Sequence, residues 1–301
     1  MLNPSGQQIE IECGDQRVVV VEVGGGLRSY EAGGGAVLDG YGADEMCASG
    51  RGQVLMPWPN RLEDGNYEFA GRQHQLALNE LDKRDAIHGL VRWVNWSVRE
   101  RDADRVVMAY RLHPQPGYPF ALDLAIEYRL SGDGLSVTTT ATNASDEPCP
   151  FGSGMHPYLT LGVPVDSLVV HAPARTVLEE DERGLPTGRA AVAGTPYDLR
   201  EPRAIGPLVL DHCFTDLERD GDGRTRVTLR DPAADKAVTL WVDGTYGFLM
   251  LFTGDPLPDV SRRSLAVEPM TCPPNAFRSG EALVALDPGA SFTGSWGIAT
   301  S

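Results

Sequence analysis

The stretch LDLAIEYRLSGDGLSVTTTA (122–141) decides the fold class of this chain. In its first half, apolar side chains occupy every second position, at Leu122, Leu124, Ile126, Tyr128 and Leu130. The alternation resumes at Leu135 after SGDG, a sequence typical of a tight turn. Because successive side chains of a strand point to opposite faces of a sheet, this period of two predicts an antiparallel β-hairpin.

The same pattern recurs along the rest of the chain. Strands are expected at 17–23, 105–112, 166–172, 226–230, 237–242, 247–253 and 264–268, with turns rich in Gly, Pro, Asp and Asn between them. No long amphipathic helix is predicted. The 34 glycines and 22 prolines are spread evenly, without a linker or a repeat. The sequence therefore predicts an all-β protein, a large antiparallel β-sandwich formed by a single domain over residues 1–301.

Composition narrows the classes of function. The 301 residues include 42 Asp and Glu against 26 Lys and Arg, a formal net charge of −16 that repels phosphate backbones and anionic lipids. We therefore expect neither nucleic acid nor membrane as a partner. The N-terminal MLNPSGQQIEIECG lacks the basic and apolar regions of a signal peptide, and no stretch reaches the ~20 apolar residues of a membrane span. A cytoplasmic protein, monomeric or homodimeric, is the expectation.

The cysteines and most histidines give little sign of metal chemistry. The five cysteines are widely spaced with no CxxC pair, so Cys213 and Cys272 are expected to be small buried hydrophobic residues rather than nucleophiles. The six histidines show no metal-ligand spacing such as HxH or HExxH, and neither a metal nor another cofactor is expected. His88, in DAIHGLVRW, and His156, in FGSGMHPYLTLG, lie beside glycines at predicted strand ends.

One carboxylate lies in a distinctive place. SLAVEPMTCPPNAF (264–277) is an apolar strand that ends on Glu268 before a Pro-rich loop. Taken alone, a strand-end glutamate is more often a solvated residue than a catalytic one. Its neighbours Val267 and Met270 are apolar, and such surroundings raise the pKa of a carboxylate.

Five motifs in order resemble the aldose 1-epimerase (galactose mutarotase) family over nearly the whole chain. They begin with PWPNRLEDGNYEFAGRQHQLALNELDKRDAIHGLVRW (57–93), YPFALDLAIEYRLSGDGLSVTTTATNASDEPCPFGSGMHPYLTLG (118–162) and LDHCF (210–214). LAVEPMTCPPNAF (265–277) and LDPGASFTGSW (286–296) complete the series. The resemblance implies a β-sandwich of the galactose mutarotase type that interconverts the anomers of a free sugar. It also implies Glu268 as the general base, His156 as the general acid, and Arg61, His88 and Asp211 as sugar-binding residues.

The chemistry of mutarotation requires such a set of residues. The ring opens when a base removes the anomeric hydroxyl proton while an acid protonates the ring oxygen, and it closes again on the other face of the aldehyde. Both groups must exchange protons near the working pH, which a histidine does unaided and a glutamate does when burial raises its pKa. Arg61 and Asp211 suit sugar hydroxyls because a guanidinium donates and a carboxylate accepts hydrogen bonds. The series thus predicts an acid/base isomerase without a cofactor.

Three alternatives remain open at the level of sequence. Arg84 and Arg92 near the first motif favour an anionic sugar, such as a phosphosugar or sulfosugar. Glu268 with Asp211 forms the carboxyl pair that a glycoside hydrolase needs, although the motifs supply a histidine as the acid. A sandwich also suits a non-catalytic sugar-binding protein, in which Trp58 or Trp93 would stack on the sugar or pack in the core.

Overall fold

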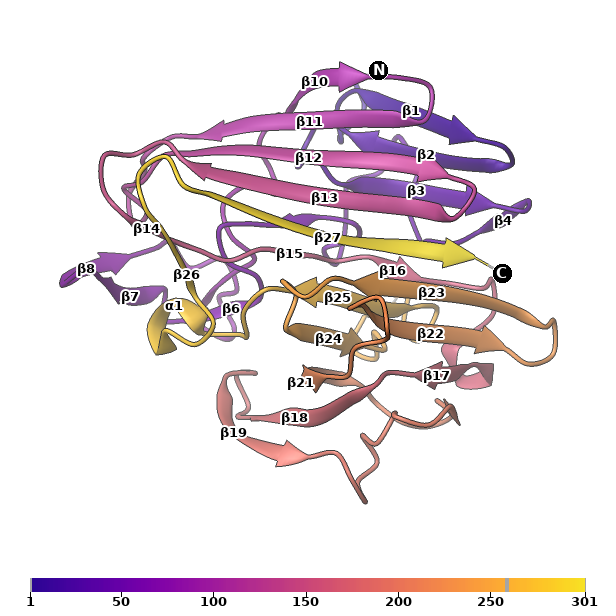
Figure 1. Cartoon of the computed structure of the whole chain (residues 1–301). Helices are drawn as coiled ribbons and strands as arrows, with labels where there is room; N and C mark the ends of the chain where they lie inside the picture. The colour runs from indigo at the N-terminus through magenta and orange to yellow at the C-terminus, as the bar shows by residue number, and fades with distance from the viewer. Residues whose placement is uncertain (1, 258–259, 301) are drawn as a thin grey trace.

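The hairpin predicted at residues 122–141 is the middle of a nine-stranded antiparallel sheet. In the computed structural model, which describes residues 2–257 and 260–300, β12 (Leu122–Ser131) pairs with β13 (Gly134–Asn143). The sheet order is β10-β11-β12-β13-β27-β23-β22-β17-β20, and Figure 1 shows β11, β12, β13 and β27 side by side. Its other strands are β10 (Ser97–Arg101), β11 (Arg105–Leu112), β17 (Val169–His171), β20 (Arg203–Ala204), β22 (Thr225–Asp231), β23 (Lys236–Val242) and β27 (Ser291–Thr300).

A second, eight-stranded sheet carries most of the residues expected to be functional. Its order is β19-β18-β21-β24-β25-β15-β5, with β16 also paired to β25. Its strands are β5 (Val54–Leu55), β15 (Gly154–Met155), β16 (Tyr158–Leu159), β18 (Ala174–Glu180), β19 (Pro186–Ala191), β21 (Asp211–Leu217), β24 (Phe248–Phe252) and β25 (Leu265–Met270). All of their pairings are antiparallel.

Smaller elements complete the fold. A four-stranded sheet contains β1 (Gln8–Cys13), β2 (Gln16–Val21), β3 (Leu27–Ala32) and β4 (Gly35–Ala36). Three two-stranded sheets join β6 (Arg61–Glu63) to β9 (Asp85–Ile87), β7 (Asn66–Phe69) to β8 (Arg72–Gln75), and β14 (Cys149–Phe151) to β26 (Val284–Leu286). The helical segments in the described part of the chain are α1 (Ala276–Ser279) and a 3₁₀ turn at Val165–Ser167. None of the described helices has the length and apolar character needed to span a bilayer.

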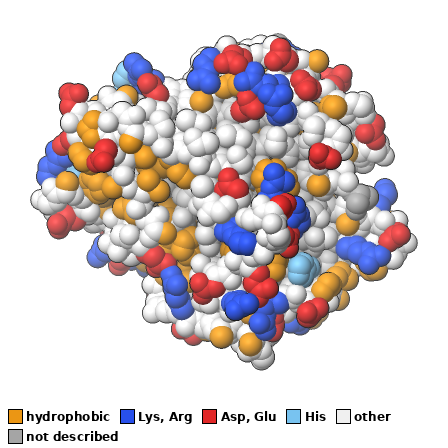
Figure 2. All heavy atoms as spheres, in the orientation of Figure 1, with side chains coloured by type: hydrophobic (Ala, Val, Ile, Leu, Met, Phe, Trp, Pro, Cys, Tyr) orange, Lys and Arg blue, Asp and Glu red, His pale blue; other side chains and the backbone are white. Residues whose placement is uncertain are grey.

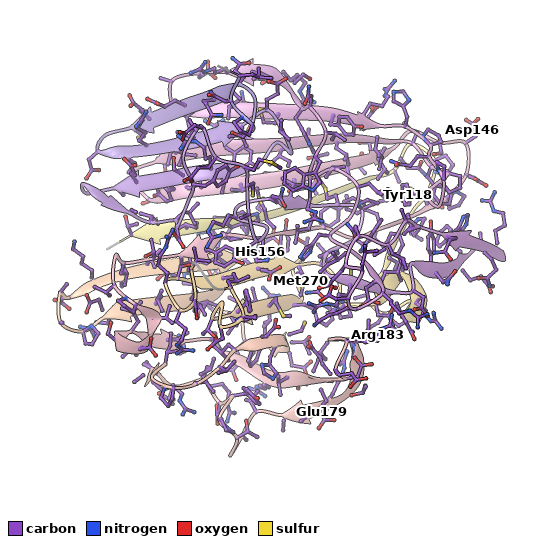
Figure 3. All side chains as sticks on the ribbon, turned by 180° about the vertical axis from the view of Figure 1, so that it is seen from behind. Tyr118, Asp146, His156, Glu179, Arg183 and Met270 are labelled. Atoms are coloured by element: carbon purple, nitrogen blue, oxygen red, sulfur yellow. The ribbon has the colours of Figure 1, made fainter. Side chains whose placement is uncertain are left out.

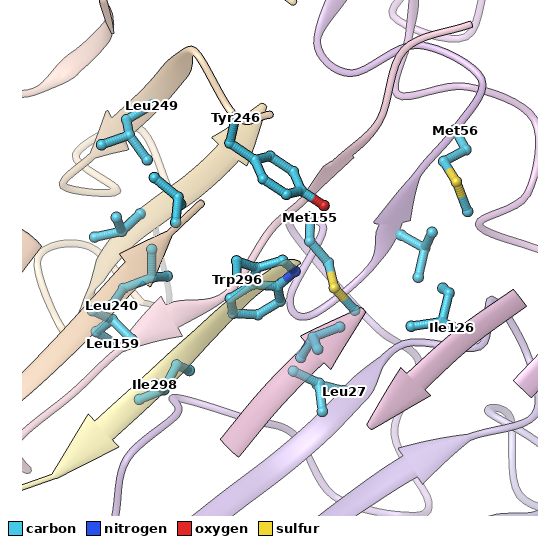
Figure 4. Packing of buried hydrophobic residues seen from close by; sticks show 14 of the residues in the cluster. Leu27, Met56, Ile126, Met155, Leu159, Leu240, Tyr246, Leu249, Trp296 and Ile298 are labelled. Carbon is cyan, nitrogen blue, oxygen red and sulfur yellow. The ribbon is translucent and has the colours of Figure 1, made fainter. Parts of the chain in front are cut away.

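One large hydrophobic core holds the sheets together. It takes side chains from both large sheets, and Figure 4 shows Trp296 and Ile298 of β27 near Leu249 of β24 and Leu159 of β16. Ile9 of β1 belongs to the same core, so the four-stranded sheet packs onto it as well. Burial of apolar surface from facing sheets is the force that favours a sandwich. The prediction of an all-β antiparallel sandwich is confirmed.

The predicted strands agree closely with the structure. The runs at 105–112, 226–230, 237–242, 247–253 and 264–268 match β11, β22, β23, β24 and β25 to within a few residues. The run at 166–172 was predicted too long, because the 3₁₀ turn occupies its first part and only Val169–His171 is a strand.

Candidate active site

Alternation along β25 directs Glu268 away from the main core. Leu265 and Val267 belong to that core, whereas Met270 belongs to a smaller cluster on the other face of the sheet, with Leu178, Cys213, Phe248 and Met250. Glu268 shares the face of Met270 because the two are separated by two positions in the strand. It pairs across the ladder with Met250 and is 2% exposed. The apolar setting predicted for this carboxylate is therefore present.

His156 contacts Glu268 directly. Its Nε2 lies 3.3 Å from Oε1 of the carboxylate. The backbone at His156 is fixed on both sides, because its N–H donates to the Gln53 carbonyl and its own carbonyl accepts from the Gly52 N–H. The imidazole also stacks on Tyr158, with ring centroids 4.8 Å apart and an interplanar angle of 10°. The labelled His156 and Met270 lie close to each other at the centre of Figure 3.

Burial shifts the two partners in opposite directions. It raises the pKa of Glu268 well above its usual value, to which the charge of Asp211 adds and which Arg61 opposes. It also lowers the pKa of His156 to about 3, with the positive charge of Arg92 acting in the same sense. Both shifts favour the neutral form of each group. A carboxylic acid beside a neutral imidazole has the same number of protons as a carboxylate beside an imidazolium, so one proton can be held by either partner.

His88 is held as a hydrogen-bond donor toward the cavity. Its Nδ1 accepts the backbone N–H of Asn60 at 3.2 Å, and its own backbone N–H donates to the Asn60 carbonyl. Burial lowers the pKa of His88 well below its usual value, so the ring is neutral. A neutral imidazole that accepts at Nδ1 carries its proton on Nε2. The following Gly89 is needed here, because a Cβ at that position would lie 2.0 Å from the Met56 carbonyl oxygen.

Arg61 is the guanidinium of the site, and it is already bound by a carboxylate. Its Nε and one terminal nitrogen donate to the two oxygens of Glu80 at 2.8 and 3.1 Å. Asp211 begins β21 and pairs with Phe252 of β24. Its negative charge acts on Arg61, Glu268 and Tyr158. Asp211 thus belongs electrostatically to the same group.

A cavity of about 280 Å³ opens beside these residues. Arg61, His88 and His156 contribute to its wall, whereas Glu268 and Asp211 do not. Glu268 is linked to the cavity through His156, and its Oε2 is buried without a hydrogen-bond partner among the described residues. The remaining wall includes Ser49, Gly50, Gln53, Glu80, Arg92, Trp93, Tyr158 and Phe252.

His88, His156 and Glu268 also have the composition of a metal site. One ligand atom from each lies within 4.8 Å of the others. Ligation through Nε2 of His88 would require moving its proton to Nδ1, where the Asn60 N–H already donates. The hydrogen bonding of His88 therefore favours donation to an oxygen ligand over coordination of a metal.

The sequence did not single out several residues of this site. Glu180 at the end of β18 is the clearest case: burial, with the negative charge of Asp211 adding to it, raises its pKa to about 7. Its Oε1 has no hydrogen-bond partner among the residues described. Glu80 and Tyr158 were also missed as participants. Glu80 and Tyr158 lie within the quoted motifs, whereas the position of Glu180 depends on which strands become neighbours in the sheet.

Other side chains considered from the sequence occupy clear positions. Trp58 is 3% exposed and packs against Phe277, whereas Trp93 is 52% exposed and lines the cavity. Burial raises the pKa of the Cys213 thiol well above its usual value and that of Cys272 to about 12. Buried thiols of this kind are poor nucleophiles at neutral pH, as expected for packing residues. His212 stacks on Tyr197, away from the apolar cluster that surrounds Met270.

Comparisons with known proteins point to one family. A family model described as aldose 1-epimerase matches residues 7–298. The chain is 34% identical over 287 residues to the uncharacterized protein YihR of Escherichia coli K12, covering 95% of this chain and 90% of that protein. It is 31% identical over 170 residues to galactose mutarotase of Homo sapiens, covering 53% of this chain and 48% of that protein. The solved galactose 1-epimerase of Lactobacillus acidophilus superposes with a TM-score of 0.82 at 23% identity, over 98% of this chain and 94% of that chain.

Proposed function

The chain belongs to the aldose 1-epimerase family, and on that premise we propose that it is a mutarotase that interconverts the α and β anomers of a free aldose. The observation that carries the proposal is the contact between His156 and Glu268, a buried imidazole and a buried carboxyl 3.3 Å apart at a cavity. Such a pair has little value for stability alone, because burying ionisable groups is costly. It is well suited to moving protons.

The proposed chemistry uses each partner once in each direction. Glu268 removes the proton of the anomeric hydroxyl, and His156 donates a proton to the ring oxygen as the C1–O5 bond breaks. Both oxygens are bonded to the same carbon, so an acid and a base that touch each other can reach both of them. The open aldehyde then rotates about C1–C2, and closure reverses the two transfers. His88, as an Nε2–H donor, together with Arg61 and Asp211, would bind the sugar oxygens.

The carboxyl and the imidazole also bear on the two other classes of function. A glycoside hydrolase requires two carboxyls that flank the bond to be cleaved, yet the group that touches Glu268 is His156 and not Asp211. A sugar-binding protein needs hydroxyl contacts but no acid and base in contact. The geometry therefore supports proton transfer to and from a free sugar.

Glu268→Gln tests the base. We expect kcat for anomer exchange, followed by polarimetry of fresh α-glucose and α-galactose, to fall by about 10²- to 10⁴-fold. Thermal stability should not fall, because the change is nearly isosteric and removes a buried ionisable group. The control is Glu281→Gln, which removes an exposed carboxylate paired with Arg189. A fully active Glu268→Gln protein would exclude Glu268 as the base.

Two further variants separate the acid from a binding residue. His156→Asn should lower kcat as strongly as Glu268→Gln does, whereas His88→Asn should also raise KM because it removes a donor to the sugar. Sugar binding without anomer exchange in the wild-type protein, across all sugars tried, would instead identify a binding protein.

The charge of the sugar is a separate question, and Arg92 bears on it. Its guanidinium lines the cavity and donates to the Gln53 side chain and the Ile87 carbonyl, with no carboxylate partner among the described residues. A partly buried guanidinium of this kind suits an anionic group on a hexose. Arg84, in contrast, is 73% exposed and faces Asp64 outside the cavity. Comparing kcat/KM for neutral hexoses and hexose 6-phosphates in wild-type and Arg92→Gln proteins decides between the two, since only anionic sugars should lose rate in the variant.

A further inference from the structure

The turn between β18 and β19, residues Asp181–Leu185, is a rigid element beside the candidate site. Oδ1 of Asp181 accepts the backbone N–H of Arg183 at 2.9 Å and that of Leu185 at 3.0 Å. The Asp181 N–H donates to the Leu185 carbonyl, and the Gly184 N–H donates to the Asp181 carbonyl. Every one of these bonds is local, so the turn holds its shape without help from the sugar site.

Gly184 in this turn packs directly against Arg61. It adopts a left-handed conformation with φ +75°, and a Cβ at this position would lie 2.5 Å from a terminal nitrogen of the Arg61 guanidinium. Glu80 binds the same guanidinium through two hydrogen bonds. The guanidinium therefore lies between the turn backbone and the Glu80 carboxylate, which together restrict where it can lie.

Arg183 in the same turn ties it to the segment that carries Glu80. It donates to the Lys83 carbonyl at 2.8 Å, to Oδ1 of Asp85 at 2.7 Å and to Oδ1 of Asp64 at 3.0 Å. Asp85 is fully buried. In the view of Figure 3, Arg183 lies between Glu179 of β18 and the site around Met270.

The contact with Asp85 reaches Arg61 through the backbone. Asp85 and Glu80 exchange both backbone hydrogen bonds, each at 3.1 Å, as an antiparallel bridge. Asp85 also begins β9, in which Ile87 pairs with Arg61. The segment fixed by Arg183 is thus the one that supplies the carboxylate partner of Arg61.

We propose that the turn Asp181–Leu185 positions Arg61 for sugar binding, Gly184 by direct contact with the guanidinium and Arg183 by fixing the segment that carries Glu80. The proposal rests on the function proposed above. Gly184 and Arg183 are positioning residues: they act through Arg61, and neither belongs to the wall of the cavity. Arg61 would then be placed by a strand that is distant in sequence.

A matched pair of glycine variants tests the direct contact. Gly184 and Gly194 have nearly the same φ, +75° and +77°, but a Cβ at Gly194 would meet nothing within 4 Å. Alanine therefore introduces the same backbone strain at both positions and displaces Arg61 only at the first. We expect Gly184→Ala to lower kcat/KM for anomer exchange roughly tenfold, mostly through KM, since a small misplacement of a binding group is costly. Gly194→Ala should match the wild type.

A second set of variants tests the role of Arg183. Arg183→Ala should also raise KM, and Arg183→Lys should recover part of the loss, because lysine restores the charge beside Asp85 but cannot bind all the acceptors at once. Arg189→Ala is the control, since Arg189 lies on the same hairpin and pairs with exposed Glu281. These variants leave the backbone of the turn unchanged, so they keep the proposal testable if Gly184→Ala does not fold.

The position of Arg61 can also be followed without any activity. The Nε–H of Arg61 is held by Glu80 and should give a protected NMR signal, which Arg61→Lys identifies by its loss. We expect this signal to shift and to exchange faster in Gly184→Ala and Arg183→Ala, but not in Gly194→Ala or Arg189→Ala. If the signal responds in this way while the wild type shows no mutarotation, the positioning role holds and the proposed function fails. Unchanged signal and unchanged KM in both turn variants would overturn the positioning role.

Discussion

Glu268 shows how far a single residue can be interpreted from sequence. A strand-end glutamate in SLAVEPMTCPPNAF is ambiguous alone, and its value came from its order among the other motifs. In the structure it is buried on the face of β25 opposite Leu265 and Val267, and it touches His156. Its contact with His156 involves residues more than a hundred positions apart, which no local pattern encodes.

The opposite shifts of Glu268 and His156 predict an unusual pH–rate profile. The pair works while it holds one exchangeable proton, on either partner. Gaining a second proton requires protonation of His156, whose pKa burial lowers, and losing the first requires ionisation of Glu268, whose pKa burial raises. Both limbs therefore move away from neutrality. We expect kcat/KM to stay level between about pH 5 and 7, where an ordinary histidine titrates.

Saturation-transfer NMR of the two anomers measures this profile at equilibrium. Circular dichroism at each pH provides the control that the protein stays folded. An acid limb centred near the ordinary pKa of histidine would contradict the environment found for His156.

The residues missed at this scale share a physical reason. Arg61, His88, His156, Asp211 and Glu268 all lie in short motifs whose residue types suggest chemistry. Glu180 lies in an ordinary strand, and its neighbours Asp211 and Arg61 are brought to it only by the pairing of β18 with β21. Strand order is a property of the whole sheet, so Glu180 could not be found from its local sequence.

At the scale of elements, period-two alternation was the most dependable signal. Long strands such as β12 and β13 follow it because one face packs on the core and the other faces solvent. β25 is buried over its whole length, so its alternation is between two apolar environments and is nearly invisible in sequence. Short strands such as β5 and β15 have too few residues for a period to appear.

The strand β27 makes a prediction of its own through Gly297. A Cβ on this residue would lie 2.3 Å from the Leu135 carbonyl oxygen of β13 and 2.5 Å from the Trp241 ring of β23. We expect Gly297→Ala to lower the free energy of unfolding by about 1–3 kcal/mol, as overpacking typically does. Urea denaturation measures the change.

The control is Gly132→Ala in the turn between β12 and β13, where a Cβ would meet nothing within 4 Å. Equal stabilities of the two variants would show that β13 and β23 can move apart at β27 with little cost.

At the scale of the whole molecule, β27 joins two parts of the chain into one sheet. It pairs with β13 on one side and with β23 on the other. The net charge of −16 is distributed over this body without a uniform field, since Figure 2 shows acidic and basic side chains interspersed on the face in view. Many of them form exposed ion pairs such as Arg111–Asp123, which contribute little to stability individually.

This architecture leads us to propose that the chain is a single cooperative domain. Both large sheets contribute to one core, and the strand between β13 and β23 comes from neither neighbour. We expect one calorimetric unfolding transition, with tryptophan fluorescence and far-ultraviolet circular dichroism changing together. Two resolved transitions would show that the β1–β13 part and the β17–β25 part unfold separately.

The central place of β27 also determines how the protein reaches its fold. A strand from residues 291–300 must pair with β13, which ends at Asn143, before the nine-stranded sheet is continuous. Contacts between residues so far apart in sequence require a large loop to close before any binding energy is returned. Folding rates decrease as such non-local contacts come to dominate. The same strand that unites the two halves therefore makes the search for the native state slow, and leaves the edges of β13 and β23 open to wrong pairing until it arrives.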